Sequence, residues 1–214
     1  MPKVFHNDRP QTLGEEIANS ISHGVGFIAA VAVTPVMIVK ANGTAAIVGV
    51  SIFGATMMVL YMASTLYHAF PQSRTKQVFQ IFDHSAIFLL IAGTYTPFTL
   101  TILYGAWGWS LFGIIWGLAA AGVVLKSVRN VKTDKLSIAL YLGMGWMAVL
   151  AAKPLYNGLP FWGLFWLLGG GVMYSLGVIF FAYDHRMQYS HFVWHLFVLA
   201  GTTCHVVAVL MYAV

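Results

Sequence analysis

The sequence predicts an all-α membrane protein built as a bundle of seven transmembrane helices. The chain has 214 residues, of which 59% are hydrophobic and only 8% are charged, whereas a soluble domain carries about 25% charged residues. The charged residues are clustered, so that four long stretches contain no Lys, Arg, Asp or Glu: residues 41–73, 84–125, 154–183 and 187–214. A helix crosses a bilayer with about 20 apolar residues. Each stretch is therefore long enough to span a membrane.

Turn residues divide the apolar sequence into seven spans. We expect these spans at residues 20–40, 45–68, 83–103, 108–126, 136–153, 161–182 and 191–213. Gly, Pro and Asn favour turns, and they separate successive spans at Asn42-Gly43, Pro71, Tyr104-Gly105 and Asn157-Gly158. The connections are short, so we expect neighbouring helices to run antiparallel within a single membrane domain of residues 1–214.

A short segment, residues 1–19, precedes the first span. Thr12-Leu13-Gly14-Glu15 matches a capping box, in which the side chains of the first and fourth residues bond each other's backbone N–H groups. We therefore expect a short amphipathic helix to begin at the membrane surface and to continue into the first span.

Positive charge predicts the orientation of the bundle. If the N-terminus is cytoplasmic, the inner segments carry nine Lys and Arg residues: Lys3, Arg9, Arg74, Lys76, Lys126, Arg129, Lys132, Lys135 and Arg186. The outer segments carry only Lys40 and Lys153. The positive-inside rule then predicts a multi-pass protein of the bacterial inner membrane, with its N-terminus in the cytoplasm and its C-terminus outside. The net charge of +5 reflects this topology and does not predict nucleic-acid binding.

Histidines gather at the predicted cytoplasmic end of three spans. His191 and His195 are four residues apart, share one face of the last span and lie in its first two turns. His68 ends the second span, one turn after Ser64, and Asp83-His84 begins the third. All of these side chains are thus expected at one depth of the same leaflet.

Three neutral imidazoles with an open fourth position are the ligand set of a hydrolytic zinc site. We assign His68, His191 and His195 as ligands of Zn²⁺. Asp83 is expected to accept a hydrogen bond from a zinc-activated water, as general base or as orienting group. Ser64 is expected to position that water or to bind a substrate carbonyl.

Each of these residues also has a purely structural interpretation. Asp83 would complement the dipole of its helix, Ser64 would bond its own helix backbone, and His84 would be a polar cap. Glu16, Asn19 and His23 form a polar stripe on the first span, which is either functional or a hydrogen-bonded brace of the bundle.

Two features lie deeper in the predicted bundle. His205 lies ten residues beyond His195, about 15 Å deeper along the helix, and we interpret it as a buried structural residue. Gly169-Gly170-Gly171 is expected to permit close helix packing.

The ordered motif set resembles that of a known family. Glu16…Asn19…His23, Ser64-x-x-x-His68, Phe82-Asp83-His84 and His191-x-x-x-His195 look like the signature of the hemolysin III proteins. These bacterial proteins are similar to the progestin and adipoQ receptors, which include the adiponectin receptors, and more remotely to the alkaline ceramidases. The resemblance implies zinc near the cytoplasmic face, held by His68, His191 and His195, with Asp83 beside the water and Ser64 in the active site.

Three functions compete at this point. The first is a zinc-dependent hydrolase of a lipid amide or ester, with a membrane lipid or fatty-acid-like ligand as its partner. The second is a membrane sensor or regulator in which zinc is structural. The third is a cytolytic protein, which the family name suggests. No residue pattern explains such an activity, because the polar cluster occupies only one end of the predicted bundle.

Overall fold

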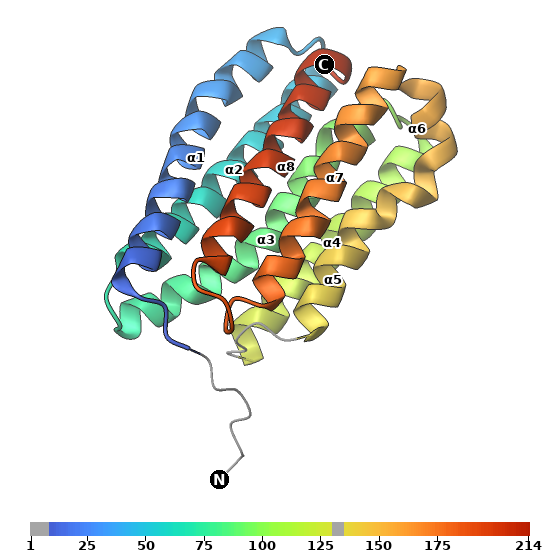
Figure 1. Cartoon of the computed structure of the whole chain (residues 1–214). Helices are drawn as coiled ribbons and strands as arrows, with labels where there is room; N and C mark the ends of the chain where they lie inside the picture. The colour runs from blue at the N-terminus through green and yellow to red at the C-terminus, as the bar shows by residue number, and fades with distance from the viewer. Residues whose placement is uncertain (1–8, 130–134) are drawn as a thin grey trace.

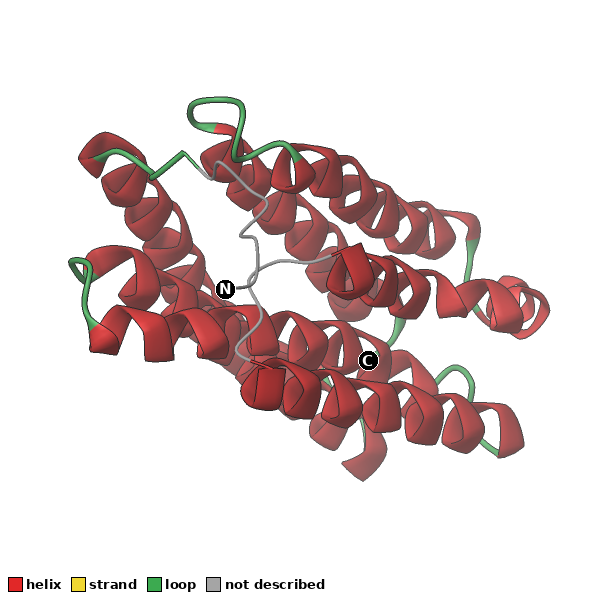
Figure 2. Cartoon of the chain, turned by 90° about the horizontal axis from the view of Figure 1, so that it is seen from below, coloured by secondary structure: helices red, strands yellow, loops and turns green. Residues whose placement is uncertain are grey.

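In a computed structural model that describes residues 9–129 and 135–214, the chain folds into a helical bundle (Figures 1 and 2). The elements of these residues are α1 (Leu13–Lys40), α2 (Thr44–Ala69), α3 (Arg74–Leu100), α4 (Ala106–Arg129), α5 (Lys135–Gly145), the 3₁₀ helix η1 (Trp146–Ala151), α6 (Ala152–Gly158), α7 (Phe161–Ala182) and α8 (Ser190–Tyr212). Within this part of the chain, seven segments are long and apolar enough to cross a membrane, the fifth being Leu136–Gly158. The predicted seven-helix membrane bundle is confirmed.

The first helix begins where the capping box predicts. The Thr12 hydroxyl accepts a bond from the N–H of Glu15, and the Glu15 carboxylate accepts one from the N–H of Thr12 at 2.8 Å. Residues Leu13–Asn19 therefore form the first turns of one continuous helix that runs to Lys40.

The third helix begins nine residues earlier than expected. We predicted its start at Asp83, but α3 begins at Arg74, with Ser73 as an N-cap that accepts a bond from the N–H of Lys76. The charged residues did not end the helix, because the Lys76 side chain is buried and bonded. The prediction that Asp83 and His84 lie in the first turn is therefore wrong, and they lie in the third turn.

Two predicted turns depend on glycine. Gly43 and Gly105 have φ angles of 86° and 101°, a region that side chains with a Cβ rarely enter. The fifth span is less regular than predicted and continues to Gly158 through η1. At this irregular point the Tyr95 hydroxyl donates to the carbonyl of Gly145 and accepts from the N–H of Ala148, at 2.7 and 2.9 Å.

The bundle has a polar interior and an apolar exterior. On α1, Ile17, Ile21 and Val25 are at least half exposed, whereas Asn19 and His23 on the opposite face are buried. This pattern suits a lipid environment, where polar groups need partners inside the bundle. Figure 1 shows α8 between α1 and α7. It packs against both helices and so connects the first helix to α7.

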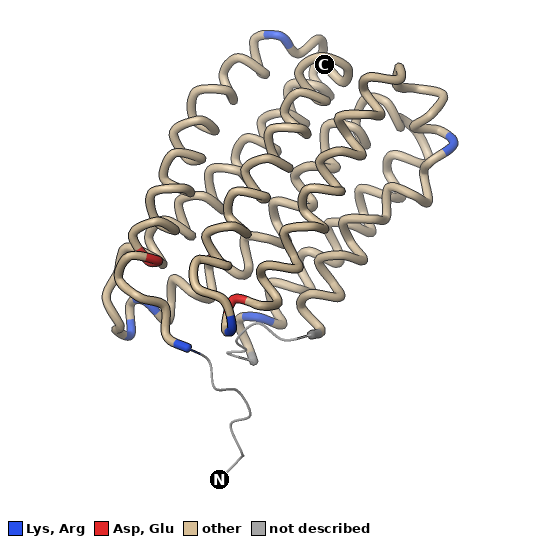
Figure 3. The backbone as a smooth tube through the Cα atoms, viewed as in Figure 1, with Lys and Arg blue, Asp and Glu red and all other residues tan. Residues whose placement is uncertain are grey.

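Small residues allow the helices to approach closely. A Cβ on Gly49 of α2 would come within 2.9 Å of the Cα of Pro97 in α3, a separation that packed side chains do not show. Close approach of this kind permits the van der Waals packing that helps helices to associate in membranes, where burial of apolar area adds little. Figure 3 shows most Lys and Arg residues at the end of the bundle where α1 begins, as the charge pattern predicted.

Candidate metal centre

Three buried histidines converge inside the bundle, near the start of α1 and α8. His68 comes from the last turn of α2, and His191 and His195 come from the first two turns of α8. One ring nitrogen from each lies within 4.8 Å of one from each of the others. The three residues are 3%, 7% and 1% exposed. Among the described residues, this is the group whose geometry suits a metal ion, and it is the set that the sequence predicted as ligands.

The Nδ1 atom of each histidine has an acceptor of its own. His68 Nδ1 lies 2.7 Å from the Glu16 carboxylate, and His191 Nδ1 lies 3.2 Å from that of Asp184. A carboxylate only accepts hydrogen bonds, so Nδ1 carries the hydrogen in both rings. His195 Nδ1 lies 3.2 Å from the carbonyl oxygen of Asn19, which fixes the same tautomer.

The Nε2 atoms are therefore left to bind a ligand. His68 Nε2 is buried without a hydrogen-bond partner, which is costly unless another group binds it. Histidines that ligate metals usually donate their other N–H to a carboxylate or a carbonyl. The three residues thus fit a divalent ion that prefers nitrogen ligands.

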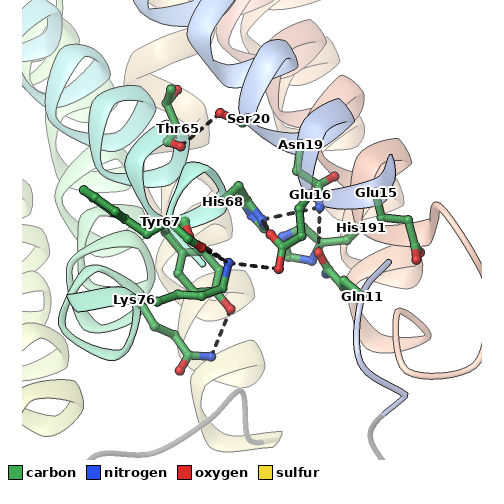
Figure 4. A network of polar contacts seen from close by, with 12 residues as sticks. Gln11, Glu15, Glu16, Asn19, Ser20, Thr65, Tyr67, His68, Lys76 and His191 are labelled. Carbon is green, nitrogen blue, oxygen red and sulfur yellow. Dashed lines mark hydrogen bonds and ion pairs between the residues drawn. The ribbon is translucent and has the colours of Figure 1, made fainter. Parts of the chain in front are cut away.

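A partly buried ion pair orients His68 (Figure 4). One oxygen of Glu16 accepts from His68, and the other lies 2.9 Å from Lys76 Nζ. The Lys76 ammonium also donates to the carbonyls of Tyr67 and Phe70 at the end of α2. The two donated bonds stabilise the C-terminus of α2 where His68 lies. Asn19 Nδ2 is 3.5 Å from His68 Nδ1, but both groups are donors, so the carboxylate of Glu16 is the acceptor.

A second carboxylate fixes the start of α8. Glu15 is buried and accepts from Arg9 at 2.9 Å and from the backbone N–H of Tyr189 at 2.8 Å. Tyr189 has a φ angle of 58° and directly precedes the helix that carries His191. The bond to Glu15 also raises the pKa of the Arg9 guanidinium above its ordinary value. The sequence indicated only the capping role of Glu15.

The other predicted site residues lie around the histidines. Asp83 and His84 are both 6% exposed and line a cavity together with His191 and His195. Asp83 does not belong to the group whose candidate ligand atoms lie within 4.8 Å of one another. Ser64 is fully buried, and its hydroxyl lies beside the Asp83 carboxylate.

His23 shares the site with the predicted ligands. Its ring stacks on that of His195 with 3.5 Å between the ring centroids. Both of its nitrogens are buried without a hydrogen-bond partner, and the residue lines the cavity. The polar stripe on α1 therefore faces the histidine cluster.

The cavity is apolar for most of its length and has a volume of about 380 Å³. It is bounded mainly by α3, α5, η1, α6, α7 and α8. At one end lie His191 and His195, and farther along α8 lies His205. The space therefore joins the histidine cluster to the apolar interior of the bundle.

Sequence reasoning missed three contributors, Lys76, Ser22 and Asp184. Lys76 counted only as a topology charge, yet it bonds Glu16. Ser22 Oγ lies 3.1 Å from His195 Nδ1. These contacts cross between helices, and the single available signal was the position of Asp184 seven residues before His191.

Comparisons with known proteins agree with the motif set. The family model described as "Haemolysin-III related" matches residues 11–206. The chain is 44% identical over 205 residues to "Hemolysin-3" of Bacillus cereus, covering 94% of this chain and 93% of that protein. It is 43% identical over 206 residues to "Hemolysin-3 homolog" of Bacillus subtilis (strain 168), covering 95% and 96%.

A human protein also matches. "Monocyte to macrophage differentiation factor" of Homo sapiens is 30% identical over 166 residues, covering 75% of this chain and 68% of that protein. No solved structure matches the chain with comparable significance.

Proposed function

This chain belongs to the haemolysin-III related family, and we propose that it is a zinc-dependent hydrolase of a lipid amide or ester in the membrane. The observation that carries the proposal is the buried group of His68, His191 and His195, whose Nδ1 atoms all have acceptors. Three histidines with an open fourth position favour zinc and hydrolytic chemistry. When bound there, zinc would acidify a water molecule and polarise a substrate carbonyl.

The residues around the cluster supply the proton transfer. The Asp83 carboxylate takes a proton from the attacking water and passes it to the nitrogen or oxygen of the leaving group. The acyl carbon gains the hydroxyl, and the amide or ester bond breaks. Both ring nitrogens of His23 are buried without a partner, and Ser64 lies beside Asp83. We assign both residues to hydrogen bonding with the substrate headgroup.

The cavity provides room for the apolar part of the substrate. Most of its lining residues are apolar, among them Leu60, Ile87, Leu90 and Val198. A membrane lipid or fatty-acid-like ligand would lie with its carbonyl at the histidines and its tail along the cavity. We propose that this end of the bundle faces the cytoplasm, which the concentration of positive charge there supports.

The first experiment is elemental analysis of the detergent-purified protein. We expect about one zinc per chain and its loss in His68→Ala, His191→Ala and His195→Ala. Zinc-loaded wild type is then incubated with membrane lipids, with His191→Ala as the matched control. Released fatty acid above that control supports the hydrolase. Zinc binding without release refutes the hydrolase, and a well-folded wild type without metal refutes the zinc site.

A sensor with structural zinc is the second function. The ligands join α2 to α8, and α1 supplies acceptors for two of them, so a bound ion would hold three helices together. Under this alternative, chelation lowers the melting temperature strongly and no lipid is consumed. Cell lysis, suggested by the name of the Bacillus cereus relative, ranks third because the polar cluster occupies only one end of the bundle.

A further inference from the structure

His205 lies in the cavity far from the metal centre. It is 6% exposed, lines the cavity, and its Nδ1 has no hydrogen-bond partner. Ten residues separate it from His195 on the same helix, a distance of about 15 Å. An imidazole buried without a partner destabilises a membrane bundle. The proposed hydrolytic chemistry does not use this group.

The surroundings leave space for the ring and do not satisfy Nδ1. A Cβ on Gly170 would come within 2.5 Å of His205 Nε2, so glycine makes room for the imidazole. The Tyr174 ring lies 5.4 Å from it, measured between ring centroids. The Tyr174 hydroxyl instead bonds Thr202, which also accepts from Tyr61. The hydroxyls of Tyr61, Tyr174 and Thr202 thus bond one another, and His205 Nδ1 is left without a partner at the cavity wall.

We propose that His205 binds a hydrogen-bonding group, most simply a hydroxyl, on the tail of a lipid whose carbonyl lies at the histidine cluster. The inference rests on the proposed function in two respects: the carbonyl lies at the histidine cluster and the tail occupies this cavity. An extended chain of single bonds advances about 3.5 Å per three bonds, as an extended polypeptide backbone does. An extended alkyl tail therefore covers the distance of about 15 Å with roughly twelve or thirteen bonds. His205 therefore selects tails that are hydroxylated near the twelfth carbon.

The test compares three fatty acids that cannot be hydrolysed. Stearic acid, its derivative with a hydroxyl on the twelfth carbon, and its derivative with a hydroxyl on the second carbon are bound to zinc-loaded protein in detergent. We expect wild type to bind the twelfth-carbon derivative about tenfold more tightly than stearic acid, the effect of one buried hydrogen bond. The second-carbon derivative controls for hydroxylation that does not reach His205.

Two variants isolate the imidazole. His205→Phe keeps a ring of similar size and removes both nitrogens, so we expect the preference to vanish while stearic acid binds as well as before. His205→Gln restores a hydrogen-bonding group and should recover part of the preference. Zinc content and melting temperature of both variants verify that they fold.

The possible outcomes separate this inference from the hydrolase. Equal binding of the three acids, or a preference that persists in His205→Phe, overturns the role of His205 and indicates that water satisfies the ring. Binding of none of the acids also overturns it, because no tail then occupies the cavity. A preference without lipid hydrolysis upholds the role of His205 and refutes only the enzyme.

Discussion

The acceptors of the Nδ1 atoms predict how strongly each neighbour contributes to metal affinity. Glu16 makes the shortest contact, 2.7 Å to His68, and its side chain is 16% exposed. Asp184 lies 3.2 Å from His191 and is 31% exposed. Charge-assisted bonds are about twice as strong as neutral ones and are shorter than about 2.9 Å. The contribution of Glu16 should therefore exceed that of Asp184.

The expected magnitude follows from the chemistry of the substitution. In Glu16→Gln the amide oxygen still accepts from His68, but the charge is lost, which costs about 1–1.5 kcal/mol or roughly tenfold in zinc affinity. Such partners of ligating histidines typically contribute about 10–100-fold. Asp184→Asn should cost about threefold or less, because water reaches the carboxylate. Ser22→Ala should also cost little, because the Asn19 carbonyl still bonds His195.

The assay is zinc competition against a chelator of known affinity, on detergent-purified protein. Melting temperatures of the metal-free variants separate loss of affinity from loss of folding, since Glu16→Gln also removes the ion pair with Lys76. If Asp184→Asn weakened zinc binding as much as Glu16→Gln, the ranking by distance and exposure would be refuted. If none of the three changes altered affinity, the histidine tautomers would not depend on these neighbours.

Three further predictions concern stability. Thr202→Val removes the hydroxyl that the buried Tyr61 and the partly buried Tyr174 share. At about 0.6 kcal/mol per bond in membranes the change should cost about 1–2 kcal/mol, and thermal melting should show recovery when both tyrosines are also changed to Phe. Glu15→Gln should weaken the bond to the Tyr189 N–H by about 1 kcal/mol. Faster hydrogen exchange of the backbone amides at the start of α8 would show this weakening, and unchanged exchange would contradict it. Lys76→Met leaves the partly buried Glu16 without its cation, which should cost about 1–3 kcal/mol. Denaturant unfolding in detergent measures this loss, and Lys76→Met combined with Glu16→Gln should be less destabilised than Lys76→Met alone.

The sequence predicted the spans and the ligand set because both depend on local regularities. Uncharged stretches gave the seven spans, and the spacing of four residues put His191 and His195 on one face of α8. His68 could be added because the alternation of spans brings the end of α2 to the same depth. The start of α3 was mispredicted since its first turn contains Arg74 and Lys76, charges that the rule for apolar spans excludes.

The contacts that orient the ligands could not be predicted in the same way. His68 bonds Glu16 across 52 residues of sequence, and His195 bonds the Asn19 carbonyl across 176. Such pairs depend on the rotation of each helix about its axis, which hydrophobic pattern fixes only coarsely when most faces are apolar. The polar stripe on α1 showed which face points inward, but not which histidine each residue contacts.

The first helix is therefore part of the candidate metal centre although it contributes no predicted ligand. Glu16 holds His68 of α2, Asn19 and Ser22 hold His195 of α8, and Glu15 holds the backbone where α8 begins. A rotation of α1 would release partners of two histidines at once, whereas a shift of the segment between α7 and α8 would displace Asp184, the partner of His191 alone. Metal affinity and the packing of α1 should consequently be coupled, so that variants that loosen α1 without touching a histidine also lose zinc.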